Sequence, residues 1–253
     1  MTITSQDNRK LKEIRKLRQR RRWRERSGRF VAEGEDLLAA ADAAGWTAAE
    51  RYCVQGSGLP GIEVDANLLA SASGLGSGTR TLAVYEERWA ERPIGPLCVY
   101  LHGLSDPGNV GTILRSAQAF AVSSVALGPG TADPFSPKAV RASMGAVFSV
   151  PIVRGVDDLD ALPGAKIALV PGEGLPLHKA CGIPPAHRDE NHTLPLREAE
   201  VTLVVGAERA GLPPEVIAAA DQVAHIPIKS ESLNAAMAAT VALYELQTRM
   251  ARA

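Results

Sequence analysis

Three polar residues in the C-terminal third of the chain lie in the segments that follow predicted strands. Glu208 comes just past the apolar run Val201–Val205, and Ser232 and Asn234 come after the run 222–226. When the strands of a sheet run parallel, ligands collect outside their carboxyl ends. A carboxylate, a hydroxyl and an amide can all form hydrogen bonds there. We therefore expect these three side chains to meet a bound ligand.

The elements that would position these residues can be predicted from segment 201–244. It indicates a strand at 201–205, a glycine-containing loop at 206–211, a short helix after Pro213 and Pro214, a strand at 222–226, a loop at 227–231 and a long helix that opens at Ser232. Short apolar runs, each followed by a turn and a helical segment, are typical of a buried parallel sheet. The sequence therefore predicts an α/β fold.

A second polar segment, 106–115, follows the apolar run Leu97–Leu101, which predicts another buried strand. Its Pro-Gly pair indicates a turn, Asn109 is expected to cap a helix, and Arg115 lies off the apolar face of that helix. Taken alone, this segment has two interpretations. It can belong to the ligand site, or its polar residues can shape the turn while Arg115 is a surface charge.

The composition is that of an ordinary soluble protein. The chain has 253 residues, 45% of them hydrophobic, which suffices for one large domain or two modest ones. No apolar run approaches the roughly 20 residues that span a bilayer, and the basic N-terminus has no apolar signal-peptide core. We therefore expect a cytoplasmic location. The widely spaced Cys53, Cys98 and Cys181 indicate buried free thiols, not a disulfide framework.

The zero net charge hides a basic N-terminal arm. Residues 9–29 contain twelve Lys or Arg residues and two Glu residues, so the arm carries +10 and the rest of the chain −10. This asymmetry indicates a polyanion partner. Guanidinium groups can pair with phosphates while an indole stacks on a base, so the candidate contacts are Arg20, Arg21, Arg22, Trp23 and Arg24. The alternative is a solvated helix whose Leu11, Ile14 and Leu17 pack on the domain.

The pattern of short elements divides the chain into two α/β parts. Residues 1–90 form the first, the Pro- and Gly-containing stretch 91–96 indicates a linker, and residues 97–253 form the second. In the second part, Lys138 and Arg141 are further basic residues expected near the active edge of the sheet. The glycine-rich stretch 74–78 lacks the context of a dinucleotide site and is expected to be a flexible loop.

One segment invites a metal interpretation. His178, Cys181, His187 and His192 are possible zinc ligands, but their spacing matches no established pattern. The sequence also contains no phosphate loop, nucleophile elbow or metalloprotease helix. We therefore predict no metal and expect the chemistry to lie in the loops that follow the strands.

Three motifs in the second part are similar to those of a known family. The stretches 106–117, 204–212 and 226–234 resemble, in this order, motifs 1, 2 and 3 of the SpoU/TrmH family. Its members are S-adenosylmethionine (AdoMet)-dependent RNA 2′-O-ribose methyltransferases of the SPOUT superfamily. The first part, through residues 8–17 and 29–34, resembles the L30e-like substrate-binding domain of rRNA-modifying members.

The resemblance implies a fold and partners. It implies a C-terminal SPOUT-type α/β domain with a trefoil knot, a small L30e-like α/β N-terminal domain, and a homodimer formed through the C-terminal domain. The last helix, with Met237, Val241 and Tyr244, offers apolar area for that dimer or for the core. The implied reaction is methyl transfer to a ribose 2′-hydroxyl, and the basic first domain favours 23S rRNA. Two alternatives stay open: a tRNA 2′-O-methyltransferase, and a non-catalytic RNA-binding or ribosome-associated protein.

The resemblance also implies roles for individual residues. Arg115 occupies the position proposed to activate the 2′-hydroxyl, but a guanidinium is effectively always protonated. We therefore interpret Arg115 as binding the adjoining phosphate and stabilising the developing alkoxide. Asn109, Glu208, Ser232 and Asn234 match polar positions that orient Arg115 and the sugar. The cofactor positions are Gly206, Ile226 and Leu233, with Gly206 letting the ligand approach the backbone closely.

Two departures from the family pattern bear on these expectations. The loop 227–231 within motif 3 is shorter than usual, which affects the shape of the donor pocket. Ala121 stands where a glycine commonly ends the motif 1 helix, so we expect this helix end to differ.

Overall fold

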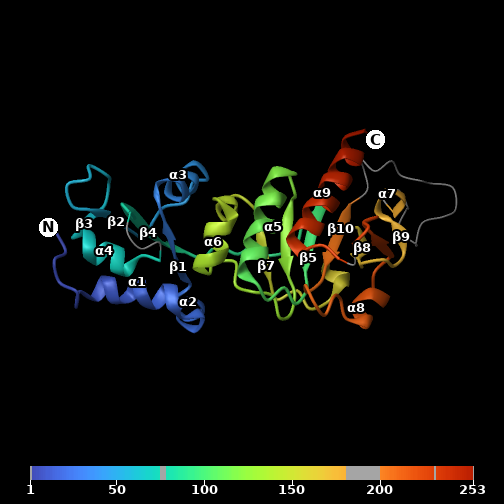
Figure 1. Cartoon of the computed structure of the whole chain (residues 1–253), viewed down its shortest axis with the longest axis horizontal. Helices are drawn as coiled ribbons and strands as arrows, with labels where there is room; N and C mark the ends of the chain where they lie inside the picture. Colours follow the sequence, from blue (N-terminus) through green and yellow to red (C-terminus); the bar gives the residue numbers. More distant parts are fainter. Residues whose placement is uncertain (1, 75–77, 181–199, 231, 253) are drawn as a thin grey trace. The chain divides into compact units, whose positions relative to one another are not determined.

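The computed structural model describes residues 2–74, 78–180, 200–230 and 232–252 (Figure 1). The chain forms two compact units. Unit 1 comprises Met1–Arg88 and Asp133–Ser149, and unit 2 comprises Trp89–Ala132 and Val150–Ala253. Among the described residues, no helix is both long and apolar enough to cross a membrane.

Unit 1 is built on a four-stranded sheet with the order β1-β4-β2-β3. Strands β1 and β2 each pair antiparallel with β4, while β2 and β3 run parallel. Its elements are α1 (Arg9–Gln19), α2 (Arg21–Ser27), β1 (Arg29–Glu33), α3 (Glu35–Ala43), β2 (Glu50–Val54), β3 (Ile62–Val64), α4 (Ala66–Ala72), β4 (Thr81–Glu86), α6 (Pro137–Ser143) and the 3-10 helix η1 (Ala146–Phe148).

The basic arm forms helices that are anchored in unit 1. Asn8 caps α1 by accepting a hydrogen bond from the backbone of Lys10. Leu11, Ile14 and Leu17 recur at helical spacing, are fully buried, and belong to the core cluster of this unit. The arm is therefore a folded part of the domain, with its apolar stripe inward and most of its charged side chains at least partly exposed.

An aromatic cluster explains why the segment Asp133–Ser149 belongs to unit 1. The ring of Phe135 lies 4.7 Å from that of Phe30, and Phe148 packs edge-on against Trp46 at 5.2 Å. The indole nitrogen of Trp46 also donates to the carbonyl of Phe148 at 2.8 Å. The sequence pattern placed this segment in the second domain, since no local signal shows that its two phenylalanines pack among the aromatic residues of the first.

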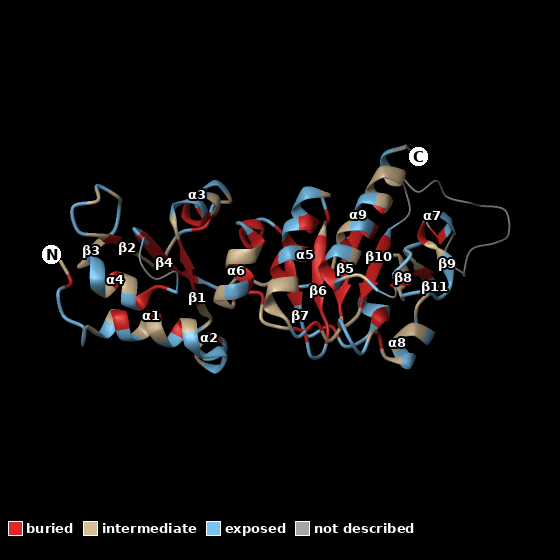
Figure 2. Cartoon of the chain, viewed as in Figure 1, coloured by how far each residue is buried: buried red, intermediate tan, exposed pale blue. Residues whose placement is uncertain are grey.

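Unit 2 is built on a seven-stranded sheet with the order β7-β6-β5-β10-β8-β11-β9, in which each recorded strand pair runs parallel. The strands of its centre are deeply buried (Figure 2). This confirms the expected α/β fold with a parallel sheet. Its strands are β5 (Leu97–Leu101), β6 (Ser124–Leu127), β7 (Ile152–Arg154), β8 (Ala165–Leu169), β9 (Leu175–Pro176), β10 (Val201–Val205) and β11 (Gln222–His225).

The order of these strands is not their order along the chain. Strand β10 lies between β5 and β8, and β11 lies between β8 and β9, so two late strands enter between earlier ones. A trefoil knot is in keeping with this insertion and remains a prediction.

Two helices of unit 2 carry the residues of interest and pack against each other. They are α5 (Pro107–Ala119) and α9 (Ala235–Arg252), and the hydroxyls of Ser116 and Thr240 lie 2.6 Å apart between them. At the end of α5, Ala121 adopts a left-handed φ of 52°, the conformation that favours glycine. The other helical elements are η2 (Leu159–Ala161), α7 (Leu177–Ala180) and α8 (Pro214–Ala218).

Candidate active site

Three of the predicted site residues form a hydrogen-bonded chain at the carboxyl ends of the sheet. Asn109 donates from Nδ2 to Glu208 Oε1 at 2.5 Å, and Asn234 donates from Nδ2 to Asn109 Oδ1 at 3.1 Å. An ionised carboxylate only accepts, so Glu208 fixes which end of the Asn109 amide faces it. Motifs 1, 2 and 3 therefore meet through one residue each.

The start of α5 explains why the Asn109 side chain is available for this chain. Asp106, not Asn109, is the N-cap, because its Oδ1 accepts from the backbone of Gly108 at 2.8 Å. Pro107 takes the first helical position, where its missing N–H costs nothing. The prediction that Asn109 caps this helix is thus wrong. Its place in the first turn instead turns its amide toward Glu208 and Asn234.

Asn234 has a second task at the start of α9. Its Oδ1 accepts from the backbone N–H groups of Ala236 at 3.0 Å and Met237 at 3.3 Å, which caps the helix. The same amide therefore fixes the entry of α9 and holds Asn109.

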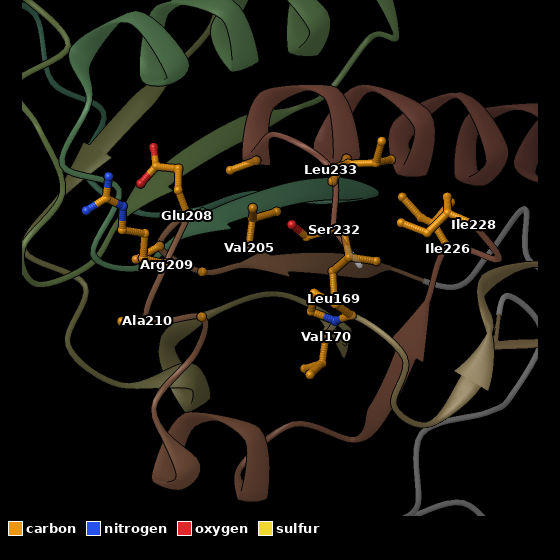
Figure 3. Close-up of a pocket in the computed structure, with 16 residues that line it drawn as sticks. Leu169, Val170, Val205, Glu208, Arg209, Ala210, Ile226, Ile228, Ser232 and Leu233 are labelled. Carbon is orange, nitrogen blue, oxygen red and sulfur yellow. The ribbon is translucent and has the colours of Figure 1, made fainter. Parts of the chain in front are cut away.

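A cavity of about 310 Å³ adjoins these hydrogen-bonded side chains (Figure 3). Its volume lies at the lower end of the roughly 300–1,000 Å³ typical of small-molecule sites. Glu208 and Ser232 line it, as do all three predicted cofactor residues, Gly206, Ile226 and Leu233. The predicted cofactor positions and two of the predicted polar positions therefore share one cavity.

Part of the wall was missed by sequence reasoning. Leu169 ends β8, Val170 and Pro171 follow it, and Arg209 and Ile228 also line the cavity. The signal for the first three is the carboxyl end of a strand, but it becomes useful only once β8 is known to lie beside β10. Arg209 stands next to Glu208 on the same side of the cavity (Figure 3).

Gly206 is required by the protein backbone itself. A Cβ atom there would lie 2.5 Å from the carbonyl carbon of Gly211 and 2.6 Å from the nitrogen of Leu212. The loop closes on itself through two backbone hydrogen bonds between Ala207 and Gly211, at 3.1 and 3.0 Å. The missing side chain thus allows the loop to fold, in addition to the close ligand approach expected from the sequence.

Arg115 and Ser232 lie outside the hydrogen-bonded chain. Arg115 is exposed and follows Asn109 by six residues, about 9 Å along the helix axis. Within the described part of the protein, its guanidinium makes no hydrogen bond or ion pair. Ser232 is exposed at the cavity wall, where its carbonyl accepts a hydrogen bond from the Ser230 hydroxyl at 3.5 Å.

The structure separates the predicted RNA contacts into two groups. Arg20, Arg21, Arg22 and Lys138 are exposed. Arg24 is only 4% exposed: it pairs with Asp133 at 2.7 Å and donates to the carbonyl of Leu17. Arg24 therefore has no free face for a phosphate.

The remaining candidates also differ from expectation. Trp23 is partly buried against the core of unit 1, and the Lys16 ammonium lies 4.5 Å above its ring. Lys138 and Arg141 belong to α6 and hence to unit 1, whereas the sequence analysis placed them at the edge of the second domain's sheet. Of the suggested metal ligands, His178 lies in α7, and Cys181, His187 and His192 lie outside the described residues.

Comparison with known proteins addresses the same two parts of the chain. Residues 96–244, which contain all three motifs, match the SpoU rRNA Methylase family. The chain belongs to this family. Residues 8–86 match the MRM3-like substrate binding domain. The expected family membership is thus confirmed. The SpoU match includes Asn109, Glu208 and Asn234 and all residues that line the cavity.

Curated relatives include rRNA methyltransferases. The 23S rRNA (guanosine(2553)-2′-O)-methyltransferase of Bacillus subtilis is 33% identical over 154 residues, which cover 58% of this chain and 56% of that protein. The 23S rRNA (uridine(2479)-2′-O)-methyltransferase of Streptomyces viridochromogenes is 36% identical over 56% of this chain and 48% of its own length. The chain thus spans about half the length of these two curated relatives.

Solved structures align over nearly the whole chain. An AdoMet-bound rRNA methyltransferase from Sinorhizobium meliloti shares 29% identity with a TM-score of 0.81, over 98% of this chain and 97% of that one. The SpoU methyltransferase AviRb from Streptomyces viridochromogenes, in complex with AdoMet, shares 25% identity with a TM-score of 0.78, over 95% and 97% of the two chains. Both units therefore have counterparts in SpoU enzymes of known structure.

Proposed function

We propose that this protein transfers a methyl group from AdoMet to a ribose 2′-hydroxyl in 23S rRNA. The observation that carries the proposal is the meeting of Asn109, Glu208 and Asn234 beside the cavity lined by Gly206, Ile226 and Leu233. The named relatives that methylate 23S rRNA support the choice of RNA.

The cavity suits a donor such as AdoMet. Its wall combines apolar side chains, including Leu169, Ile226 and Leu233, with the residues of the 206–211 loop. Such a wall can bury a largely apolar ligand and orient it through a few polar groups. The two AdoMet-bound neighbours support this assignment. When bound, AdoMet supplies the electrophilic methyl group.

The hydrogen-bonded residues and Arg115 would orient the ribose that accepts the methyl group. As the new O–C bond forms and the sulfur–methyl bond of the donor breaks to leave a thioether, the ribose hydroxyl must lose its proton to water or to the adjoining phosphate. Alignment and charge stabilisation both lower that barrier. Arg115 cannot take the proton, because a guanidinium stays protonated. Its role is to bind the adjoining phosphate and stabilise negative charge on the 2′-oxygen. Asn109, Glu208 and Asn234 form the rigid polar support, and Ser232 adds a hydroxyl at the cavity wall.

The exposed arginines of the basic arm would bind the RNA backbone, whereas Arg24 supports the fold. Replacing Arg22 with alanine is expected to weaken RNA binding without lowering the melting temperature. The slope of log K against log salt should fall by about 0.7 to 0.9, the loss of one phosphate contact. Replacing Arg24 is expected to destabilise the protein by about 3 kcal/mol, because the largely buried Asp133 carboxylate would lose its cation.

Salt-dependent filter binding and thermal unfolding of the two variants provide the comparison. Equal melting temperatures for Arg24→Ala and the unchanged protein, together with equal losses of RNA affinity in both variants, would contradict this division of roles.

We further propose that the protein works as a homodimer through α9. Met237, Val241 and Tyr244 recur on one face of this helix, where 59%, 44% and 59% of their surfaces are exposed. Tyr244 also contacts Phe120 at the end of α5. An exposed apolar stripe on a folded domain is typical of an interface. Sedimentation should give twice the 26.7 kDa chain mass, and Met237→Glu should give a monomer.

The reaction itself can be tested with tritiated AdoMet. The protein should label 23S rRNA transcribed in vitro, and nuclease digestion should release a 2′-O-methylated nucleotide. Labelling of tRNA instead would show that the substrate is tRNA and not 23S rRNA. AdoMet binding without transfer to either RNA would favour a non-catalytic RNA-binding protein. The cytoplasmic location expected from the sequence remains a prediction.

A further inference from the structure

A buried tyrosine holds a histidine at the carboxyl edge of the unit 2 sheet. Tyr100, near the end of β5, is only 1% exposed, and His102 follows that strand. The Tyr100 hydroxyl lies 3.1 Å from the carbonyl oxygen of Val156 and 3.2 Å from Nδ1 of His102. None of the three motifs includes either residue.

The direction in which the Tyr100 hydroxyl donates its proton determines which nitrogen of the His102 ring carries a hydrogen. The carbonyl of Val156 can only accept, so the hydroxyl donates its proton there. Toward His102 the hydroxyl oxygen must then act as acceptor, and Nδ1 of His102 must carry a hydrogen. In the neutral imidazole this leaves Nε2 as a hydrogen-bond acceptor.

The environment keeps Tyr100 protonated and in place. Burial, with added repulsion from Asp157 and Asp158, raises the pKa of Tyr100 to about 12. Gly128 leaves room for the Tyr100 ring because it has no side chain. A Cβ atom there would lie 2.1 Å from the Tyr100 hydroxyl oxygen. The hydroxyl is therefore built into the fold as a support for His102.

His102 adjoins the wall of the cavity. Its backbone N–H donates to the carbonyl of Val205 at 2.9 Å, and a Cβ on the next residue, Gly103, would be 3.6 Å from Cβ of Ala207. Val205 and Ala207 both line the cavity. His102 is partly exposed, so a ligand at this edge can reach it.

The hydrogen-bonding character of the site gives this imidazole a task. Arg115 and Arg209 offer donors only, Glu208 Oε1 already accepts from Asn109, and the remaining side-chain acceptors among the described residues at the cavity are Glu208 Oε2 and the Ser232 hydroxyl. A nucleotide, however, presents donors as well as phosphate acceptors, including ribose hydroxyls and base amino groups. An acceptor with a fixed tautomer complements those donors.

We propose that Nε2 of His102 accepts a hydrogen bond from the target nucleotide, and that Tyr100 is a positioning residue that fixes the tautomer. This inference rests on the proposed methyl transfer to RNA. It adds a nucleotide contact beyond the three motifs.

Two substitutions at position 102 separate an Nε2 contact from a structural role. His102→Gln keeps an acceptor near the Nε2 position, whereas His102→Asn keeps one only near Nδ1. With tritiated AdoMet and 23S rRNA transcribed in vitro, His102→Asn should lose roughly tenfold in kcat/KM, as expected for one lost hydrogen bond. His102→Gln should recover part of that loss. AdoMet affinity by calorimetry and the melting temperature should match the unchanged protein in both variants.

Tyr100→Phe tests the support. Nitrogen NMR of His102 should show Nδ1–H as the main neutral tautomer in the unchanged protein and a mixture in Tyr100→Phe, with a lower kcat/KM for RNA. An unchanged tautomer in Tyr100→Phe would overturn the positioning role. Equal losses in His102→Gln and His102→Asn, or no loss in either, would overturn the nucleotide contact. Absence of transfer by the unchanged protein would instead refute the proposed function itself.

Discussion

Replacement of Arg115 with alanine is expected to reduce methyl transfer by about 10²- to 10³-fold, the usual cost of removing one group that stabilises developing negative charge. AdoMet affinity should stay nearly unchanged. Arg115 does not line the cavity, and no described residue bonds to its guanidinium, so its loss removes no support from the donor site. Single-turnover transfer with tritiated AdoMet and calorimetry of AdoMet binding measure the two quantities separately.

Two further variants sharpen the test of Arg115. Arg115→Lys keeps the charge but loses the planar fork that grips a phosphate at two points, so it should recover only part of the activity. Arg92→Ala removes an exposed arginine elsewhere in unit 2 and should behave like the unchanged protein. A fall in AdoMet affinity that parallels the fall in transfer would show that Arg115 serves the donor and not the acceptor.

Replacement of Gly206 with alanine is expected to abolish measurable AdoMet binding. The added methyl would lie 2.5 and 2.6 Å from backbone atoms of Gly211 and Leu212, which are not free to rotate away like a flexible side chain. The loop would have to open and break its hydrogen bonds between Ala207 and Gly211. Because this loop forms one wall of the cavity and carries Glu208, both donor binding and transfer should be lost.

A change outside the cavity wall provides the matched control. Ala218, at the end of α8, is exposed and does not line the cavity, so Ala218→Ser adds one hydroxyl away from the donor site. It should retain AdoMet affinity within a few-fold. Circular dichroism and thermal unfolding should show that Gly206→Ala remains folded as a whole. Normal AdoMet affinity in Gly206→Ala would show that the loop can relax and that its closed form is dispensable.

The parallel sheet and the three site loops could be predicted because their signals are local. The strand of motif 2 is a short, mostly apolar run, the strand of motif 3 carries Val223 and Ala224 between two polar residues, and each strand is followed by a loop that carries polar residues. Asn109 lies about a hundred positions or more from Glu208 and Asn234, so local patterns could not predict their contact. It was expected from the resemblance alone. The capping role given to Asn109 failed because Asp106 with Pro107 provides a better helix start.

Other features depend on partners that the sequence does not reveal. Arg24 stands in a run of arginines, and its contacts with the Asp133 carboxylate and the Leu17 carbonyl distinguish it from its exposed neighbours. The cavity wall formed by Leu169 and Val170 can be predicted only when the strand order is known. In that order β8 lies beside β10, although many residues separate the two strands along the chain. Patterns along the chain describe single elements well, whereas these contacts arise from tertiary packing.

The residence of Asp133–Ser149 in unit 1 has a consequence for dissecting this protein. A truncated chain that began at Leu97 would keep Phe135 and Phe148 but lose Phe30, Trp46 and Tyr85, against which they pack. The orphaned rings would face water and favour aggregation. The N-terminal part is thus no detachable appendage, and swapping it between relatives would require exchanging this internal stretch with it.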